Sequence, residues 1–386
     1  MTALCPTIGS AVRIDCHALG LLISALERRG YQVIGPSIKD SAICYTTVRG
    51  IDDLPIGWTA EQEPGKYRLQ RRSDSAMFGY AAAANSLKSF LHPAELKLFT
   101  AQRDNGAFRI LPNDEPAPRY AFLGVRACEL AAAGIQDRVL IEDRFTDPGY
   151  RDRRSNSIVI AIQCSEPAAT CFCTSMGTGP RVTKGFDLAL TEIVDAGTHE
   201  FLVEVGTETG AELLGDIEFS DASTELREKS RALTKHTEQA ITRRMDTNGL
   251  SEMLRSSFDH PQWDDVASRC LACGNCTQVC PTCFCVAVED STDITGQHAE
   301  RVRTWDSCFT LGFSYIHGGS VRVSTKSRYR QWLTHKLSYW NDQFGASGCV
   351  GCGRCIAWCP VGIDLTKEVV ALRAPAIEQI SERGGQ

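Results

Sequence analysis

The chain has 386 residues, a formal net charge of −6 and 18 cysteines. This length predicts about two or three domains with enough apolar residues for a core, and the negative charge argues against nucleic acid as a partner. Apolar stretches such as 18–26 and 157–162 are too short to span a bilayer. No signal peptide is apparent, so we expect a cytoplasmic, reducing environment in which cysteines bind metals rather than form disulfides.

The first part of the chain, up to about residue 246, alternates predicted helices and strands. A helix is expected over 15–29, where a glycine follows it. Strands are expected over 31–34, 42–48, 66–71 and 96–103, and a turn at 104–106 leads into another strand over 107–111. Unbroken apolar runs at 120–125 and 157–162 are typical of strands buried on both faces. A long charged helix over 223–245 connects this region to the next.

Four cysteines follow the two predicted buried strands. Cys128 comes after the first strand and opens a helical segment, whereas Cys164 follows the second strand, with Cys171 and Cys173 in the loop behind it. If the strands are parallel neighbours, these side chains meet at the edge where open α/β sheets build their sites. A helix N-terminus would favour the thiolate form of Cys128. The sequence predicts a metal site here rather than four buried apolar cysteines, and the spacing fits zinc or an iron–sulfur cluster.

Beyond residue 246 the chain contains the spacing C-x2-C-x2-C-x3-C-P twice. The two copies are Cys270, Cys273, Cys276, Cys280 and Pro281, and then Cys349, Cys352, Cys355, Cys359 and Pro360. This spacing holds 4Fe–4S clusters in two-cluster ferredoxins, where the fourth cysteine ligates the other cluster. Glycines at 274, 351 and 353 allow the sharp turns between ligands. Beside two such motifs, a third 4Fe–4S cluster is the favoured occupant of the earlier four-cysteine site.

The region around the repeated motifs is predicted to be helical. Helices are expected over 250–258 and 263–269, and the segment 305–342 lacks strand alternation. The long insert between the motifs is typical of the α-helical type of two-cluster ferredoxin. The predicted fold class is therefore α+β, with an N-terminal α/β domain over 1–246 and an α-helical dicluster ferredoxin domain over 247–386.

The remaining cysteines are expected to pack rather than to ligate, because both repeated motifs already have four ligands. They are Cys5, Cys16, Cys44, Cys283, Cys285 and Cys308, and the role of the last three stays open. The spacing of Cys276, Cys280 and Cys283 also matches radical S-adenosylmethionine enzymes. That match overlaps a complete ferredoxin motif and lies outside any barrel-like repeat, so we discount it.

Several signatures of catalysis are missing from the sequence. It has no dinucleotide-binding or ATP-binding motif and no adjacent cysteine pair, and its eight histidines are scattered. We therefore predict no catalytic acid, base or nucleophile. The basic, aromatic stretch 322–340 allows two interpretations: it docks an acidic partner, or it is a solvated helix whose charges offset anionic clusters.

Long segments resemble the 4Fe–4S dicluster subunits of cytoplasmic oxidoreductases. They are CGNCTQVCPTCFC (273–285), RVRTWDSC (301–308), RYRQWLTHK (328–336) and GCVGCGRCIAWCPVGID (348–364), with GVRACELAA (124–132), DPGYRDRRSN (147–156) and CFCTSMGTGP (171–180) upstream. The resemblance covers most of the chain and is nearest to the β subunits of NAD(P)-linked nickel–iron hydrogenases, the sulfhydrogenases. The electron-transfer subunit of anaerobic sulfite reductase is a more distant relative. Glu129 stands where the family more often has aspartate.

The resemblance implies an electron-transfer subunit that makes no bonds itself. It would relay electrons between a flavin subunit that binds NAD(P)H and the small and large nickel–iron subunits of a hydrogenase. The implied ligands are Cys270, Cys273, Cys276 and Cys359 for one cluster, Cys280, Cys349, Cys352 and Cys355 for a second, and Cys128, Cys164, Cys171 and Cys173 for a third. The alternatives are the electron-transfer subunit of an anaerobic sirohaem sulfite reductase and a stand-alone iron–sulfur sensor or scaffold, although no effector domain such as a helix-turn-helix is present.

Overall fold

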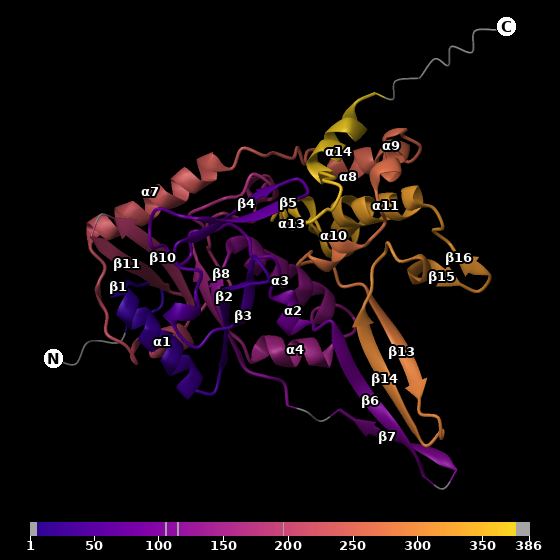
Figure 1. Cartoon of the computed structure of the whole chain (residues 1–386), viewed down its shortest axis with the longest axis horizontal. Helices are drawn as coiled ribbons and strands as arrows, with labels where there is room; N and C mark the ends of the chain where they lie inside the picture. Colours follow the sequence, from indigo (N-terminus) through magenta and orange to yellow (C-terminus); the bar gives the residue numbers. More distant parts are fainter. Residues whose placement is uncertain (1–5, 105, 114–115, 196, 376–386) are drawn as a thin grey trace.

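The computed structural model describes residues 6–104, 106–113, 116–195 and 197–375. Its largest element is an eight-stranded sheet with the strand order β12-β1-β11-β10-β9-β8-β2-β3 (Figure 1). The strands are β1 (Ala11–Asp15), β2 (Gln32–Lys39), β3 (Ala42–Thr47), β8 (Tyr120–Val125), β9 (Ile158–Ile162), β10 (Leu188–Asp195), β11 (Thr198–Val205) and β12 (Ser220–Asp221). β8 and β9 are parallel neighbours, which is the condition on which the predicted four-cysteine site depends, so both end at the same edge of the sheet.

Helices cover both faces of this sheet. The helix α1 (Cys16–Arg28) begins at Asp15, whose side chain accepts a hydrogen bond from the Ala18 amide, and it buries Leu22 in the larger core. On the other face, Leu226 of α7 (Thr224–Ala240) packs on Leu202 of β11. The other helices of this part are α2 (Lys88–Leu91), α3 (Ala127–Leu140), α4 (Pro148–Ser155), α5 (Cys173–Met176) and α6 (Glu208–Leu214), with a 3-10 turn at Ile51–Asp53.

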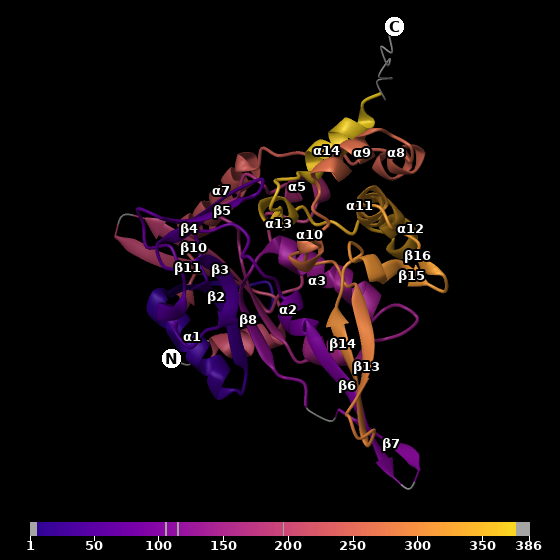
Figure 2. The same ribbon diagram turned by 45° about the vertical axis from the view of Figure 1, so that its right-hand side comes forward.

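A second sheet of four strands projects from the body of the molecule (Figure 2). It pairs the predicted hairpin of β6 (Glu95–Asp104) and β7 (Ala107–Pro112) with a second hairpin, β13 (Val286–Thr292) and β14 (His298–Trp305). Asn105, in the predicted turn, lies outside the described residues. The sequence predicted a helical insert between the cysteine motifs. This prediction was wrong for residues 286–305, which form the β13–β14 hairpin. β13 is mostly exposed and β14 mostly half-buried on both faces, so neither shows the apolar alternation typical of a strand with one buried face.

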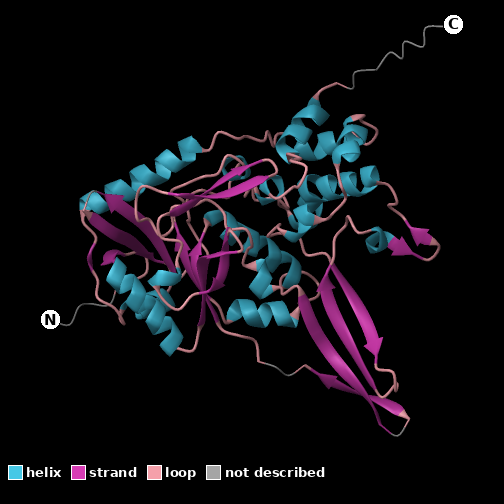
Figure 3. Ribbon diagram, viewed as in Figure 1, coloured by secondary structure: helices cyan, strands magenta, loops and turns pink. Residues whose placement is uncertain are grey.

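The C-terminal part is built around a helical core (Figure 3). Its helices are α8 (Leu250–Ser256), α9 (Gln262–Arg269), α10 (Asn275–Gln278), α11 (Thr325–Thr334), α12 (Trp340–Phe344), α13 (Arg354–Ala357) and α14 (Leu365–Arg373). There are also two small hairpins, β4 (Trp58–Glu63) with β5 (Lys66–Arg71) and β15 (Tyr315–Ile316) with β16 (Gly319–Ser320). A 3-10 turn at Leu311–Ser314 and a π-helical turn at His335–Tyr339 complete the described elements. The basic stretch 322–340 is not a solvated helix, because Tyr329, Trp332 and Leu337 are buried in this core.

The division near residue 246 stays a prediction. The four-stranded sheet takes one hairpin from each side of that position, and the two parts share further contacts around the cysteines described below. Among the residues that the structure describes, no helix is long and apolar enough to cross a membrane.

Candidate metal centres

The two cysteine motifs fold as structural repeats. In each, a loop turns through a left-handed glycine, Gly274 (φ 74°) or Gly353 (φ 76°), into the short helix α10 or α13. The first cysteine of each motif accepts an amide hydrogen bond from the residue two positions on. These N–H···S distances are 3.4 Å from Ala272 to Cys270 and 3.5 Å from Gly351 to Cys349.

The eight motif cysteines surround two neighbouring cavities. The residues that line the first cavity include Cys270, Cys273, Cys276, Cys355 and Cys359, and those that line the second include Cys280, Cys349, Cys352 and Cys355. The fourth cysteine of each motif thus faces the cavity formed mainly by the other motif. This exchange is the one expected for a pair of interlocked ferredoxin motifs.

The structure also brings the four upstream cysteines together. Cys128, Cys164, Cys171 and Cys173 line a third cavity at the carboxyl edge of β8 and β9. The lining of this cavity also includes Cys352, and Cys355 lines both the first and the second cavity. The three cavities therefore lie in a row, with the second in the middle.

The loop of the third cavity docks directly on the second motif. The Phe172 amide donates to the Gly351 carbonyl (2.8 Å), and the Thr178 hydroxyl donates to the Val350 carbonyl (2.6 Å). A Cβ on Gly351 would lie only 2.7 Å from the backbone nitrogen of Cys173. Glycine is therefore required at position 351 for the backbone of the two loops to approach this closely.

We expect Gly351→Ala to lower the free energy of unfolding by about 1–3 kcal/mol beyond the cost of its positive φ, because one loop must move away. Gly177→Ala is the matched control. Gly177 has a similar φ (66°, against 65° for Gly351), but open space surrounds its Cβ position. Urea denaturation of both anaerobically purified variants measures the difference, and equal midpoints would contradict the close packing of the loops.

Buried cations face the cavities. Lys336, 5% exposed, donates from Nζ to the sulfur of Cys280 (3.2 Å) and contacts Cys283 (3.6 Å). Arg126 lines the third cavity, and the guanidinium donates to the carbonyls of Phe78, Tyr80 and Gln163. Among the described residues, neither cation has a carboxylate within ion-pair distance. An unpaired buried charge is costly, so both sites fit an anionic occupant.

A buried ion pair connects the second and third centres. Arg354, in the second motif, pairs with Glu129 next to Cys128, and each side chain is 1% exposed. Arg354 also donates to the carbonyls of Ala83 (2.7 Å) and Asn85 (3.0 Å), while Glu129 accepts from the Leu87 amide (3.2 Å). Sequence reasoning missed both roles, although Glu129 stands out as a departure from the family.

Burial raises the pKa of most of the cavity thiols, whereas a hydrogen bond with Cys283 and the charge of Lys336 lower the pKa of Cys280. Cys128 lies at the start of α3 as predicted, but burial raises its pKa well above the ordinary value, against the expected effect of the helix N-terminus. Burial also raises the pKa of Cys173 and of Cys349 to about 12. Such thiols stay protonated near neutral pH until a cationic group such as iron displaces the proton.

The other described cysteines do not line these three cavities. Cys285 and Cys308 lie side by side at the base of the β13–β14 hairpin. The hydrogen bond between them lowers the pKa of Cys285 to about 7 and raises the pKa of Cys308. Cys16 and Cys44 are in the N-terminal sheet region, and Cys5 lies outside the described residues. Within the described ranges, no three His, Cys, Asp or Glu side chains are placed to hold a single metal ion.

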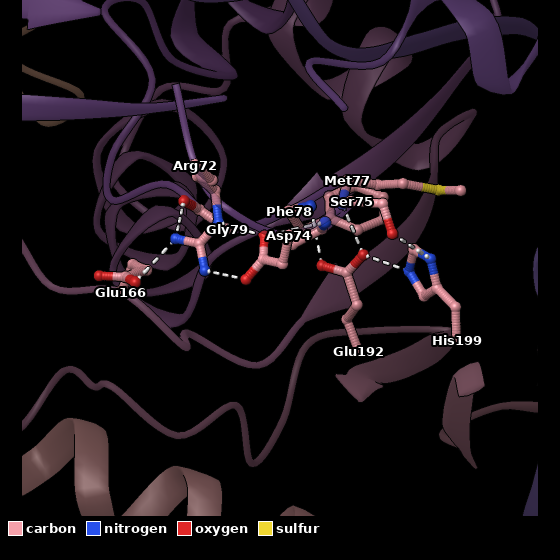
Figure 4. Close-up of polar contacts among 10 residues, drawn as sticks. Arg72, Asp74, Ser75, Met77, Phe78, Gly79, Glu166, Glu192 and His199 are labelled. Atoms are coloured by element: carbon pink, nitrogen blue, oxygen red, sulfur yellow. Dashed lines mark hydrogen bonds and ion pairs between the residues drawn. The ribbon is translucent and has the colours of Figure 1, made fainter. Parts of the chain in front are cut away.

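A polar network fixes the segment that forms one wall of the third cavity (Figure 4). Arg72 pairs with Asp74 and Glu166, and the carboxylate of Glu192 accepts from the amides of Met77 (2.6 Å) and Phe78 (2.8 Å) and contacts His199 Nε2 (2.8 Å). The segment then continues to Ala81 and Ala82 in the cavity lining. Ser75 is exposed and makes only a long hydrogen bond, 3.5 Å, with His199 Nδ1.

Comparison with known proteins agrees with this geometry. Residues 269–363 match the 4Fe-4S dicluster domain family. The chain is 30% identical over 345 residues to the sulfhydrogenase 2 subunit beta of Pyrococcus furiosus, covering 89% of this chain and 92% of the relative. The chain belongs to the sulfhydrogenase β-subunit family. No solved structure matches it. The repeated motifs form a 4Fe–4S dicluster domain, and the cysteine-lined cavities fit such clusters.

Proposed function

We propose that the chain is the electron relay of a hydrogenase complex and holds three 4Fe–4S clusters in a row. The observation that carries this proposal is the series of cavities, in which Cys352 and Cys355 are each shared between neighbours. Iron–sulfur clusters supply one-electron chemistry when bound. The chain's own residues hold the centres next to one another and bury them.

The proposed ligands follow the cavity linings. Cys270, Cys273, Cys276 and Cys359 hold the first cluster, Cys280, Cys349, Cys352 and Cys355 hold the second, and Cys128, Cys164, Cys171 and Cys173 hold the third. At the third site the sulfurs surround a cavity and are not placed around a single ion. This arrangement supports a cluster rather than tetrahedral zinc, whose sulfurs lie about 2.3 Å from one metal.

Of the three proposed centres, we propose that the first lies at the protein surface and forms one end of the row. Cys273 is exposed, and the neighbouring Leu271 and Val361 are 63% and 41% exposed. The lining of the first cavity contains these apolar residues and no charged side chain. An apolar surface beside a redox centre suits contact with another protein of the complex. We propose as partners a flavin subunit that binds NAD(P)H and the small and large nickel–iron subunits.

Purification of the native complex tests these partners. Tagged chain, captured anaerobically from its own cells, should bring down a flavoprotein and both nickel–iron subunits, identified by mass spectrometry and by nickel and flavin analysis. Capture of a sirohaem protein without nickel would contradict the hydrogenase assignment and indicate a sulfite reductase. Capture of the chain alone, with its iron, would indicate a free-standing protein.

A further inference from the structure

The two centres of the dicluster domain differ in the groups that contact the sulfur of their fourth cysteines. Their first cysteines, Cys270 and Cys349, each accept one backbone amide at closely similar distances (3.4 and 3.5 Å). Their fourth cysteines do not match. Cys359 accepts from the backbone amide of Ile363 (3.3 Å). Cys280 accepts from the side-chain ammonium of Lys336 (3.2 Å) and also lies 3.1 Å from the Thr282 hydroxyl. One centre thus has a neutral donor where the other has a cation.

The fold places Lys336 at this sulfur. The residue lies in a π-helical turn, His335–Tyr339, between α11 and α12, and such turns are frequent at functional sites. Its ammonium also contacts the Thr282 hydroxyl (3.1 Å) and the Gly348 carbonyl (3.1 Å). In the part of the chain that the structure describes, its recorded partners are these two oxygens and the sulfurs of Cys280 and Cys283. The charge is therefore directed at the second centre.

We propose that Lys336 raises the reduction potential of the second, central cluster above that of the first. The inference rests on the proposed function, because it requires a cluster at each site. Reduction adds one negative charge, and a fixed cation in a poorly solvated site stabilises the reduced form. The first cavity has no charged side chain in its lining, and Arg328, whose charge acts on Cys270 from outside it, donates to the Phe309 carbonyl (2.6 Å). Among the described residues, no cation is recorded in contact with a ligand sulfur of the first centre as Lys336 is with Cys280. The central cluster then accepts electrons from the first cluster.

Redox titration of the whole chain, purified anaerobically and followed by electron paramagnetic resonance, tests the proposal. Lys336→Met removes the charge at similar length, and Lys336→Arg retains it. We expect Lys336→Met to lower the reduction equilibrium constant of one cluster at least about tenfold, which is about 59 mV for a one-electron couple. The other clusters should keep their potentials. Lys326→Met is the control, because Lys326 lies on α11 and pairs with Asp264 at the surface.

Iron and sulfide analysis of each protein separates failure of this inference from failure of the proposed function. Wild-type chain without iron would overturn both. Full iron in Lys336→Met with unchanged potentials would overturn the role of Lys336 alone, as would an equal shift in Lys336→Arg. If Lys336→Met loses about four irons, Lys336→Gln is measured as a second neutral variant. Loss in both neutral variants and retention in Lys336→Arg would support the need for a cation, whereas loss in all three would overturn it.

Discussion

Replacement of Cys171 and Cys173 by serine is expected to lower the iron content from about twelve to about eight atoms per chain, since each cubane holds four irons. Both sulfurs line the third cavity, and neither lines the cavities of the dicluster domain. The loss should therefore be confined to one cluster. Iron and acid-labile sulfide, measured on anaerobically purified protein, give the count.

The matched control removes two other sulfurs. Cys16 and Cys44 lie outside the three cavities, so Cys16→Ser with Cys44→Ser should leave the iron content unchanged. A wild-type content of about eight irons would contradict a third cluster. If zinc accompanied those eight irons and disappeared with Cys171 and Cys173, the third site would be a zinc site.

The largest loss of stability is expected for Glu129→Leu. Removal of Glu129 leaves the buried guanidinium of Arg354 without its carboxylate partner, which costs about 3–5 kcal/mol. Asp290→Ala breaks an ion pair with Arg301 whose side chains are 61% and 42% exposed, and it should cost less than about 1 kcal/mol. The measurement is the shift in the urea midpoint of anaerobic protein.

The double variant sharpens this test. Glu129→Leu combined with Arg354→Leu removes both charges, so it should be more stable than Glu129→Leu alone. Glu129→Asp keeps the carboxylate and should cost less than Glu129→Leu. A Glu129→Leu midpoint as little changed as that of Asp290→Ala would contradict the structural role of the pair.

The sequence was most informative where spacing alone determines geometry. The repeated cysteine motif and the two apolar strands followed by cysteines indicated all three groups, because the spacing of ligands in a loop and the burial of a strand can be recognised in a short stretch of sequence. The β13–β14 hairpin was missed, because neither strand has one buried face and so neither shows apolar alternation. β14 is held by pairing with β6, which is far away in the sequence.

The buried charges could not be predicted from local spacing. The partner of Arg354 is Glu129, and the sulfur that Lys336 contacts is on Cys280; both contacts join segments remote in sequence. One signal was present in the stretch 322–340. Lys336 follows Tyr329, Trp332 and Leu333 at helical spacing, so it occupies a position on the buried face of a helix where an apolar residue is usual.

Reduction by hydrogen tests the central claim most directly. The native complex, purified anaerobically, is incubated under hydrogen and compared with a dithionite-reduced sample by electron paramagnetic resonance. The account predicts that hydrogen alone produces the signals of reduced 4Fe–4S clusters from this chain, and that Cys171→Ser with Cys173→Ser removes the contribution of the third centre. Clusters of this chain that dithionite reduces and hydrogen leaves oxidised would contradict its role as the electron relay of a hydrogenase.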